Sequence, residues 1–173
     1  MRAEVSTRFA IEDDIATLAI FEREVACLSF PQDPITDLEY HSEKLRRALR
    51  AEPEGMVVMA LEEEVVAWLW MTTKISLATR ERYGVLRTVY VREDLRGHGL
   101  AKSLVQYCAR HFEGLGIYRV VAKVYHGNQA ALGLLRYGGF APLHVTLERR
   151  GAWRAAAEED ELPATDDEGD GDE

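Results

Sequence analysis

The chain has little cysteine and no long apolar run. It contains two cysteines in 173 residues, Cys27 and Cys108. Both lie in apolar helical patterns, so we expect reduced, buried thiols and no disulfide. The longest apolar run, Val65 to Met71, is far too short to span a bilayer. The N-terminus lacks the apolar core of a signal peptide, so we expect a soluble, cytoplasmic protein with no membrane partner.

The sequence also lacks the residue spacing of a metal site or an acyl-enzyme. Its five histidines are scattered without the regular separations of metal ligands, at His41, His98, His111, His126 and His144. No Ser-His-Asp or Cys-His arrangement indicates a nucleophilic side chain that would form a covalent intermediate. We therefore expect neither a bound metal nor an acylated side chain.

The formal net charge of −9 belongs to the end of the sequence. Residues 151–173 contain ten of the 30 acidic residues and one of the 21 basic residues, which leaves 20 of each sign in residues 1–150. The main part is formally neutral, which does not indicate a nucleic-acid partner. We expect a domain at 1–150 and a disordered acidic tail at 151–173, because the tail has few large apolar groups. A solubilising tail is favoured over an arm that contacts a basic partner or screens a site on the domain.

Hydrophobic periodicity predicts alternating strands and helices over residues 1–150. Strands are predicted at 4–10, 56–61, 65–73, 85–91, 118–125 and 143–149, and helices from about 15, at 36–50 with a cap from Thr36 or Asp37, at 99–112 and at 129–137. The unit from Val85 to Tyr125 is a strand, a helix and a strand, so these two strands should be parallel.

Residues 85–101 join a β-branched segment to a helical one through a short charged turn. Gly97 and Gly99 stand where the strand gives way to the helix, and a ligand can approach a glycine backbone closely. The first N–H groups of a helix have no partner within the helix, and together with the helix dipole they favour an anion. This pattern indicates a pyrophosphate-binding turn.

Two motifs, which follow one another along the sequence, resemble the two signatures of the GCN5-related N-acetyltransferase (GNAT) family. The sequence Arg-Gly-His-Gly-Leu-Ala at 96–101 matches the central motif Arg/Gln-x-x-Gly-x-Gly/Ala, and Asn128 opens a segment that ends in Gly139-Phe140 like the second signature. A dinucleotide-binding Gly-x-Gly would require a small residue where Lys102 stands and an acidic residue about 20 positions later. Neither is convincing in this sequence.

The resemblance implies an α/β (α+β) fold with a mixed, mainly antiparallel sheet flanked by helices, in the order β-α-α-β-β-β-α-β-α-β. It implies acetyl-CoA as the acyl donor and direct transfer to a primary amine in a ternary complex. The pantetheine arm would lie between residues 85–91 and 118–125 and use strand amides at Val89 and Val91. The cofactor-binding residues that it implies are Val89, Tyr90, Val91, Arg96, Gly97, His98, Gly99, Leu100, Ala101, Lys102 and Asn128.

The chain departs from the family where the leaving thiolate is protonated. The family usually has a tyrosine five residues before the phenylalanine of Gly-Phe, and this chain has Leu135 there. Tyr137 is two residues later and lies about 200° around the helix. Other phenols near the expected cleft belong to Tyr90, Tyr107 and Tyr125, and water or the substrate ammonium are alternative proton sources. Asn128 is also expected to cap the helix that follows it.

Several side chains are candidates for the base that deprotonates the amine. The base candidates are Glu22, Glu24, Asp94 and His126. With the candidate proton donor Tyr137 included, the catalytic candidates are Glu24, His126 and Tyr137. The acceptor should enter beside the linker from Cys27 to Thr36 and the last strand, where Asp33 would attract an ammonium. A catalytically idle acyl-CoA-binding module is the alternative, because Leu135 replaces the tyrosine. The sequence identifies neither the amine acceptor nor whether the protein forms a homodimer.

Overall fold

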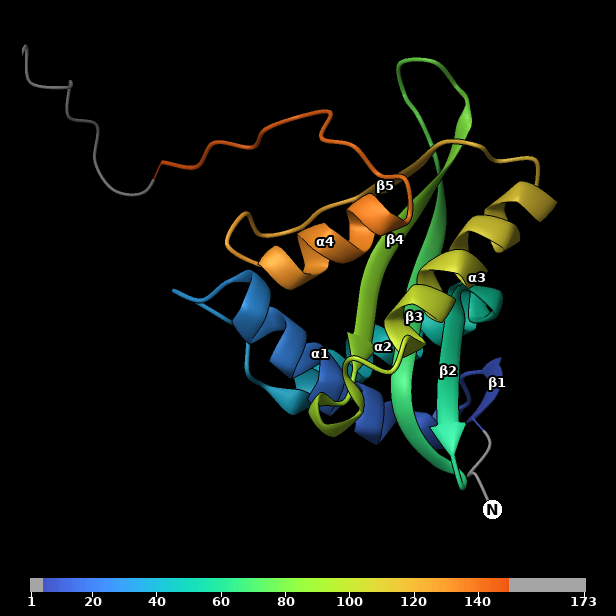
Figure 1. Ribbon diagram of the computed structural model, residues 1–173, viewed down its shortest axis with the longest axis vertical. Coiled ribbons are helices and arrows are strands. Elements are labelled where there is room, and N and C mark those ends of the chain that lie inside the picture. Colours follow the sequence, from blue (N-terminus) through green and yellow to red (C-terminus); the bar gives the residue numbers. More distant parts are fainter. Residues whose placement is uncertain (1–4, 150–173) are drawn as a thin grey trace, which may run out of the picture. The chain divides into compact units, whose positions relative to one another are not determined.

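Five strands form one sheet in the order β1-β2-β3-β4-β5 in the computed structural model, which describes residues 5–149 (Figure 1). The strands are β1 Val5–Phe9, β2 Met56–Leu61, β3 Glu64–Ile75, β4 Arg82–Val91 and β5 Val120–Ala122. The first four strands pair antiparallel and β5 pairs parallel to β4. The mixed, mainly antiparallel sheet predicted from the sequence is therefore confirmed.

Four helices cover the two faces of this sheet (Figure 1). They are α1 Ile15–Ser29, α2 Leu38–Ala51, α3 Leu100–Gly114 and α4 Gln129–Tyr137. One buried cluster joins α1 and α2 to Trp68, Trp70 and Tyr90, and a second joins α3 to Leu69 and Met71. In Figure 1, α3 and α4 lie in front of the sheet and α1 and α2 behind it.

The apolar run at 65–71 forms the centre of β3, and every one of its residues is buried. A strand that is covered on both faces has no need of alternating polar residues, which explains an unbroken apolar run of this length. Within residues 5–149, no helix is both long and apolar enough to cross a membrane.

The helix start predicted at residue 36 or 37 is confirmed at Asp37. Its carboxylate accepts hydrogen bonds from the N–H groups of Glu39, at 2.9 Å, and Tyr40, at 3.4 Å. The start of α1 is fixed differently, because Asp14 is buried and accepts two hydrogen bonds from the Arg8 guanidinium at 2.7 and 2.9 Å. These contacts tie β1 to the turn before α1.

Two predicted strands differ from the structure. The strand predicted at 118–125 is only three residues long, because β4 pairs with it only over Val120–Ala122. Residues 143–149 form no strand, although Val145 and Leu147 alternate with polar residues as a strand would. Alternation alone does not make a strand, because the main-chain N–H and C=O groups must also pair with a neighbouring strand. The compact unit that carries the sheet ends at Ala141.

Cys27 is exposed, so the prediction that both thiols are buried is wrong for this residue. The core on this face reaches only as far as Val25 along α1, and Cys27 lies one half-turn beyond it. Cys108 is buried on α3 as predicted. Neither cysteine forms a disulfide in the described part of the chain. The predicted acidic tail at 151–173 lies outside the described residues.

Candidate active site

β4 and β5 pair at only three positions, and beyond these a gap in the pairing leaves one edge of β4 open. The parallel pairing joins Gly84 to Val120, Val85 to Val121 and Leu86 to Ala122. β4 then continues to Val91 with β3 as its only strand neighbour among the described residues. The second half of β4 therefore has one free main-chain edge.

A β-bulge in β4 marks the point where the strands separate. Leu86 is opposite Met71 of β3 and Thr88 is opposite Trp70, which leaves Arg87 as the extra residue. The extra residue of such a bulge moves the alternation along the strand by one position. Residues after the bulge therefore direct their main-chain groups to the opposite side from the one expected without it. The guanidinium of Arg87 lies over the Trp70 ring at 4.5 Å from its centroid, on the face covered by α1 and α2.

The main-chain groups of Val89 and Val91 point into this gap. The N–H of Arg92, the residue after β4, donates to the Val66 carbonyl of β3 at 2.8 Å. Residues of an antiparallel strand alternate between facing the partner and facing away from it. Because Arg92 faces β3, Tyr90 and Thr88 face it as well, and Val89 and Val91 present their N–H and C=O groups to the open side.

The turn from β4 to α3 depends on two glycines in the left-handed region. Gly97 has φ +83° and Gly99 has φ +85°, a conformation that residues with a Cβ rarely adopt. A Cβ placed on either glycine would meet no atom within 4 Å, so the space beside both is open. Open space beside a left-handed turn allows a ligand to approach the backbone.

α3 begins at this turn without a side-chain cap. Gly99 is its N-cap and supplies no side chain, and the first hydrogen bond of the helix joins the Ser103 N–H to the Gly99 carbonyl at 3.0 Å. Over residues 5–149, the N–H groups of Leu100, Ala101 and Lys102 have no acceptor. Unpartnered N–H groups at a helix N-terminus form an anion-binding site.

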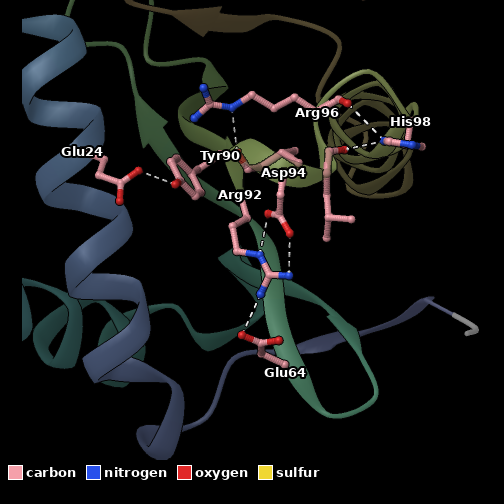
Figure 2. Close-up of polar contacts among 9 residues, drawn as sticks. Glu24, Glu64, Tyr90, Arg92, Asp94, Arg96 and His98 are labelled. Atoms are coloured by element: carbon pink, nitrogen blue, oxygen red, sulfur yellow. Dashed lines mark hydrogen bonds and ion pairs between the residues drawn. The ribbon is translucent and has the colours of Figure 1, made fainter.

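Ion pairs fix the turn on its other side (Figure 2). Arg92 binds the Asp94 carboxylate at 2.7 and 3.0 Å and the Glu64 carboxylate at 2.6 Å. The hydrogen bonds from Arg92 lower the pKa of Asp94. A carboxylate with a lowered pKa that is held in an ion pair is a poor proton acceptor, so Asp94 is the weakest of the base candidates.

Arg96 and His98 direct their side chains back onto the same turn (Figure 2). The Nε of Arg96 donates to the Val91 carbonyl at 3.0 Å, and its guanidinium lies 5.8 Å from the centroid of the Tyr90 ring. The Nδ1 of His98 lies 3.3 Å from the Leu95 carbonyl and 3.1 Å from the Arg96 carbonyl. Both side chains therefore stabilise the turn, and the main chain is left to face a ligand.

α4 is capped as predicted, since the Asn128 side chain accepts from the Ala131 N–H at 3.0 Å. Leu135 packs into the core under α3. The Tyr137 hydroxyl accepts from the Gln106 amide of α3 at 2.8 Å, and Lys102 lies over its ring at 4.6 Å from the centroid. These contacts place Tyr137 against α3. This agrees with the prediction that Tyr137 and residue 135 lie on different sides of the helix.

The fold brings Glu24, alone of the three catalytic candidates, into hydrogen-bond contact with β4 among the described residues. The Tyr90 hydroxyl donates to the Glu24 carboxylate (Figure 2). His126 is exposed after β5, where its ring lies 4.7 Å from that of Tyr125. Tyr137 lies on α4 and bonds to α3. Burial and the bond to Glu24 raise the pKa of Tyr90 to about 12.

Sequence reasoning missed Lys44 and Thr88, which are the partners of the base candidate Glu22. The Glu22 carboxylate is buried and binds Lys44 of α2 at 2.6 Å and the Thr88 hydroxyl at 2.7 Å. Glu22 follows the apolar Phe21 on the buried side of α1, and a charged residue at such a position predicts a buried partner. The sequence does not reveal that Lys44 and Thr88 are those partners.

The linker between α1 and α2, expected to border the acceptor entrance, exposes apolar groups. Phe30 is 56% exposed and Ile35 is 48% exposed, and Asp33 is also exposed. The last strand that was expected beside it does not form. In the described part of the chain, no group of three His, Cys, Asp or Glu side chains is arranged to hold a metal ion.

The part of the chain that carries the open strand, the left-handed glycine turn and the uncapped helix matches a known family. The model of the Acetyltransferase (GNAT) family matches residues 18–140, which include β4, β5, α3 and α4. The chain belongs to the GNAT family. The family assignment made from the two GNAT motifs is thereby confirmed.

The chain is similar to two curated relatives over part of its length. It is 30% identical over 99 residues to mycothiol acetyltransferase of Streptomyces coelicolor, which covers 57% of this chain and 31% of that protein. It is 41% identical over 56 residues to L-methionine sulfoximine/L-methionine sulfone acetyltransferase of Pseudomonas paraeruginosa, which covers 32% of this chain and 33% of the relative. The matches span about a third of each relative's length.

Solved structures of this family share the fold at low identity. A possible acetyltransferase from Clostridium difficile 630 aligns with a TM-score of 0.70 and 19% identity over 87% of this chain and 99% of that one. A predicted acetyltransferase from Clostridium acetobutylicum, solved with acetyl-CoA, aligns with a TM-score of 0.66 and 15% identity over 85% of this chain and 96% of that one. These likenesses agree with the predicted GNAT fold.

Proposed function

We propose that this protein is an N-acetyltransferase that moves an acetyl group from acetyl-CoA to a primary amine by direct transfer in a ternary complex. The observation that carries this proposal is the free main-chain edge of β4 at Val89 and Val91, which leads directly into the glycine turn and the uncapped start of α3. An extended polar arm that ends in a pyrophosphate fits these two features in that order.

The residues present fit the donor in two respects. The unpartnered N–H groups at the start of α3 would bind the pyrophosphate, with Gly97, Gly99 and the main chain of Arg96 and His98 shaping the turn. Val89 would donate and accept main-chain hydrogen bonds along the pantetheine arm, and Val91 would donate through its N–H, since its carbonyl already accepts from Arg96. Lys102, on the first turn of α3, adds positive charge, and Asn128 belongs to the donor site by family resemblance.

The transfer itself requires three events at the thioester. The amine nitrogen attacks the carbonyl carbon, the carbonyl oxygen gains negative charge, and the C–S bond breaks as the thiolate of CoA leaves. The Val89 N–H would donate to the carbonyl oxygen, where it stabilises the charge that develops. No side chain needs to be acylated, so the amine and the donor must be bound together.

Glu24 is the proposed base, because its carboxylate lies at the hydroxyl of Tyr90 on β4. The amine enters as an ammonium and must lose a proton before it attacks. Glu24 would take this proton directly or through the Tyr90 hydroxyl, which gives its own proton to Glu24 as it receives one. The pKa of Tyr90 is raised to about 12, so the phenol is neutral and can act in such a relay.

Residue 135 is a leucine, so it cannot give a proton to the leaving thiolate as a tyrosine at this position would. Leu135 packs against the core and Tyr137 bonds to Gln106, so the thiolate would take the second proton, which the nitrogen loses after it attacks, or a proton from water. The idle acyl-CoA-binding module was proposed because of Leu135. Membership of an acetyltransferase family favours the enzyme over that module.

The acceptor is proposed to be a small amine. The relatives are acetyltransferases of mycothiol and of methionine sulfoximine, and a structural neighbour from Acinetobacter baumannii is an aminoglycoside 6'-N-acetyltransferase. The exposed linker at 30–37 would border the acceptor entrance, where Asp33 attracts the ammonium.

Two assays test this proposal on the full chain. Thermal unfolding with acetyl-CoA at about a hundred times its dissociation constant should add about 2.7 kcal/mol of stability, whereas NAD should add none. Gly99→Glu should abolish the shift, because it places a carboxylate at the anion site. Gly114→Glu, at the other end of α3 where a Cβ also meets nothing within 4 Å, should retain it.

The second assay measures release of free CoA with a panel of aminoglycosides, amino acids, polyamines and peptide N-termini. CoA release with at least one amine, together with a mass increase of that amine by one acetyl group, supports the enzyme. A thermal shift without any CoA release would favour the acyl-CoA-binding module. A shift with NAD instead of acetyl-CoA would overturn the assignment of the donor.

A further inference from the structure

A buried polar chain connects β4 to the first two helices, and the proposed transfer does not use it. Glu22, in the middle of α1, is only 5% exposed. Its Oε1 accepts from the Thr88 hydroxyl at 2.7 Å and its Oε2 accepts from the Lys44 ammonium at 2.6 Å. Burying a carboxylate is costly unless it is paired and hydrogen-bonded, and here each carboxylate oxygen has a partner.

The polar chain continues from Lys44 to the α1–α2 linker. The Lys44 Nζ lies 3.4 Å from the Nδ1 of His41, and the Nε2 of His41 lies 2.8 Å from the Ile35 carbonyl. An ammonium can only donate, so Nδ1 is the acceptor and Nε2 carries the proton that is donated to Ile35. Four contacts therefore tie the linker, α2, α1 and β4 to one another.

This chain of polar contacts ends on β4 at Thr88, the residue before Val89. Thr88 follows the bulge residue Arg87 and is 6% exposed. The carbonyl of Thr88 and the N–H of Val89 belong to one peptide unit, which is planar. Whatever fixes Thr88 therefore fixes the direction in which the Val89 N–H points.

A bulge is the place in a strand where this direction is least constrained by neighbours. The ladder to β3 is interrupted between Trp70 and Met71, and no β5 residue pairs with β4 beyond Leu86. The hydrogen bond from Thr88 to Glu22 adds a side-chain constraint at this point. It holds the strand from the face opposite to α3.

We propose that Thr88 and Glu22 are positioning residues for acetyl transfer. Glu22, held by Lys44, fixes the Thr88 hydroxyl, and Thr88 in turn orients the peptide plane whose N–H, at Val89, polarises the thioester carbonyl. This inference rests on the role of Val89 given under Proposed function. It assigns a task in the reaction to the ion pair of Glu22 and Lys44, which acts through Thr88 and is not proposed to contact the donor or the amine.

Thr72 of β3 offers a matched control. It lies on the neighbouring strand, and its buried hydroxyl has no hydrogen-bond partner among the described residues. Thr72→Val and Thr88→Val make the same chemical change, from a hydroxyl to a methyl group of similar shape. Only Thr88→Val removes a bond to Glu22. Thr88→Ser restores the hydroxyl and serves as the rescue variant.

The test compares the affinities for acetyl-CoA and S-ethyl-CoA by calorimetric titration of the full chain. S-ethyl-CoA lacks the carbonyl oxygen, so the ratio of the two affinities reports the hydrogen bond from Val89 without any amine acceptor. Wild type should prefer acetyl-CoA by about 3- to 10-fold, the value of one hydrogen bond. Thr88→Val should reduce this preference to about one, and Thr72→Val and Thr88→Ser should keep it.

Kinetics add a second readout with the amine found by the CoA-release assay. Thr88→Val and Glu22→Gln should lower kcat by about 10-fold or more and raise the KM for acetyl-CoA by no more than the roughly 3- to 10-fold lost in binding, because the lost contact is stronger in the transition state than in the bound donor. A preference for acetyl-CoA that is unchanged in Thr88→Val would overturn the inference alone, whereas a preference that is absent in wild type would overturn the role of Val89 as well. Failure of wild type to bind either ligand would overturn the donor assignment and the inference with it.

Discussion

The phenol of Tyr90 on β4 donates a hydrogen bond to the carboxylate of Glu24 on α1. The ring of Phe21, one turn earlier on the same helix, stacks on Tyr90 at 4.3 Å between centroids. Burial and the neighbouring carboxylate raise the pKa of Tyr90 to about 12, so the phenol remains a donor at neutral pH. Helix α1 thus brings a second carboxylate, besides that of Glu22, to the strand that carries the proposed thioester contacts.

Glu24→Gln should lower kcat by about 100-fold, the lower range for loss of a general base. The amide still accepts a hydrogen bond from Tyr90 but cannot take a proton, so the fold is kept and the base is lost. Steady-state kinetics at saturating acetyl-CoA measure the effect. Glu43→Gln, which changes an exposed carboxylate on α2, should leave kcat unaltered. A Glu24→Gln enzyme with the wild-type kcat would show that Glu24 is not the base.

Gly99→Ala should destabilise the fold by about 1 to 2 kcal/mol and weaken acetyl-CoA binding. The reason is its φ of +85°, since a Cβ there meets no atom and only the backbone conformation is unfavourable. Gly114→Ala, in the last turn of α3 and also open, should be neutral or stabilising. Urea denaturation and calorimetric titration of both variants check this, and equal effects of the two would contradict it.

Asp14→Asn should cost about 1 to 3 kcal/mol at pH 7, because it removes a charge-assisted hydrogen bond to Arg8. Burial tends to raise the pKa of Asp14, but the hydrogen bonds from Arg8 and the Ile11 N–H outweigh it and lower the pKa. A lowered folded-state pKa stabilises the protein above the unfolded-state value of about 4, and this stability is lost as the pH falls through the folded-state pKa. Urea midpoints at pH 7 to 3 should therefore converge for wild type and Asp14→Asn. Asp13→Asn, next to it but exposed, should show no such convergence.

Cys27 should react with maleimide in the folded protein and Cys108 should not. Cys27 is exposed near the end of α1, whereas burial raises the pKa of the Cys108 thiol to about 12 and leaves almost no thiolate. Mass spectrometry should find one label per native chain and two after denaturation. Cys27→Ser should abolish the native label, and a label that persists in this variant would show that α3 opens.

Local signals in the sequence predicted the parts of the site that are made by local structure. Asp37 and Asn128 each precede a helix and cap it, and Gly97 and Gly99 form the left-handed turn that the motif requires. These features depend on a few neighbouring residues, so a short stretch of sequence contains the necessary information.

Features that depend on distant partners were not predictable in the same way. Thr88 lies 66 residues from Glu22, and Lys44 lies 22 residues from it, so no local pattern joins them. The strand at 118–125 had a suitable pattern, but its pairing with β4 ends at Ala122. Similarly, residues 143–149 alternate as a strand would but form none. Pairing, more than propensity, decided the length of these elements.

The uncapped start of α3 has a consequence for how the protein behaves between turnovers. Most helices carry their own cap, but the one that begins at Leu100 has only the open glycine turn before it. If a phosphate is its natural partner, the donor completes the helix as a missing capping residue would. The first turn of α3 would then fray each time CoA leaves and re-form when the next donor arrives, so that amide exchange at Leu100 to Lys102 reports the loading state of the enzyme.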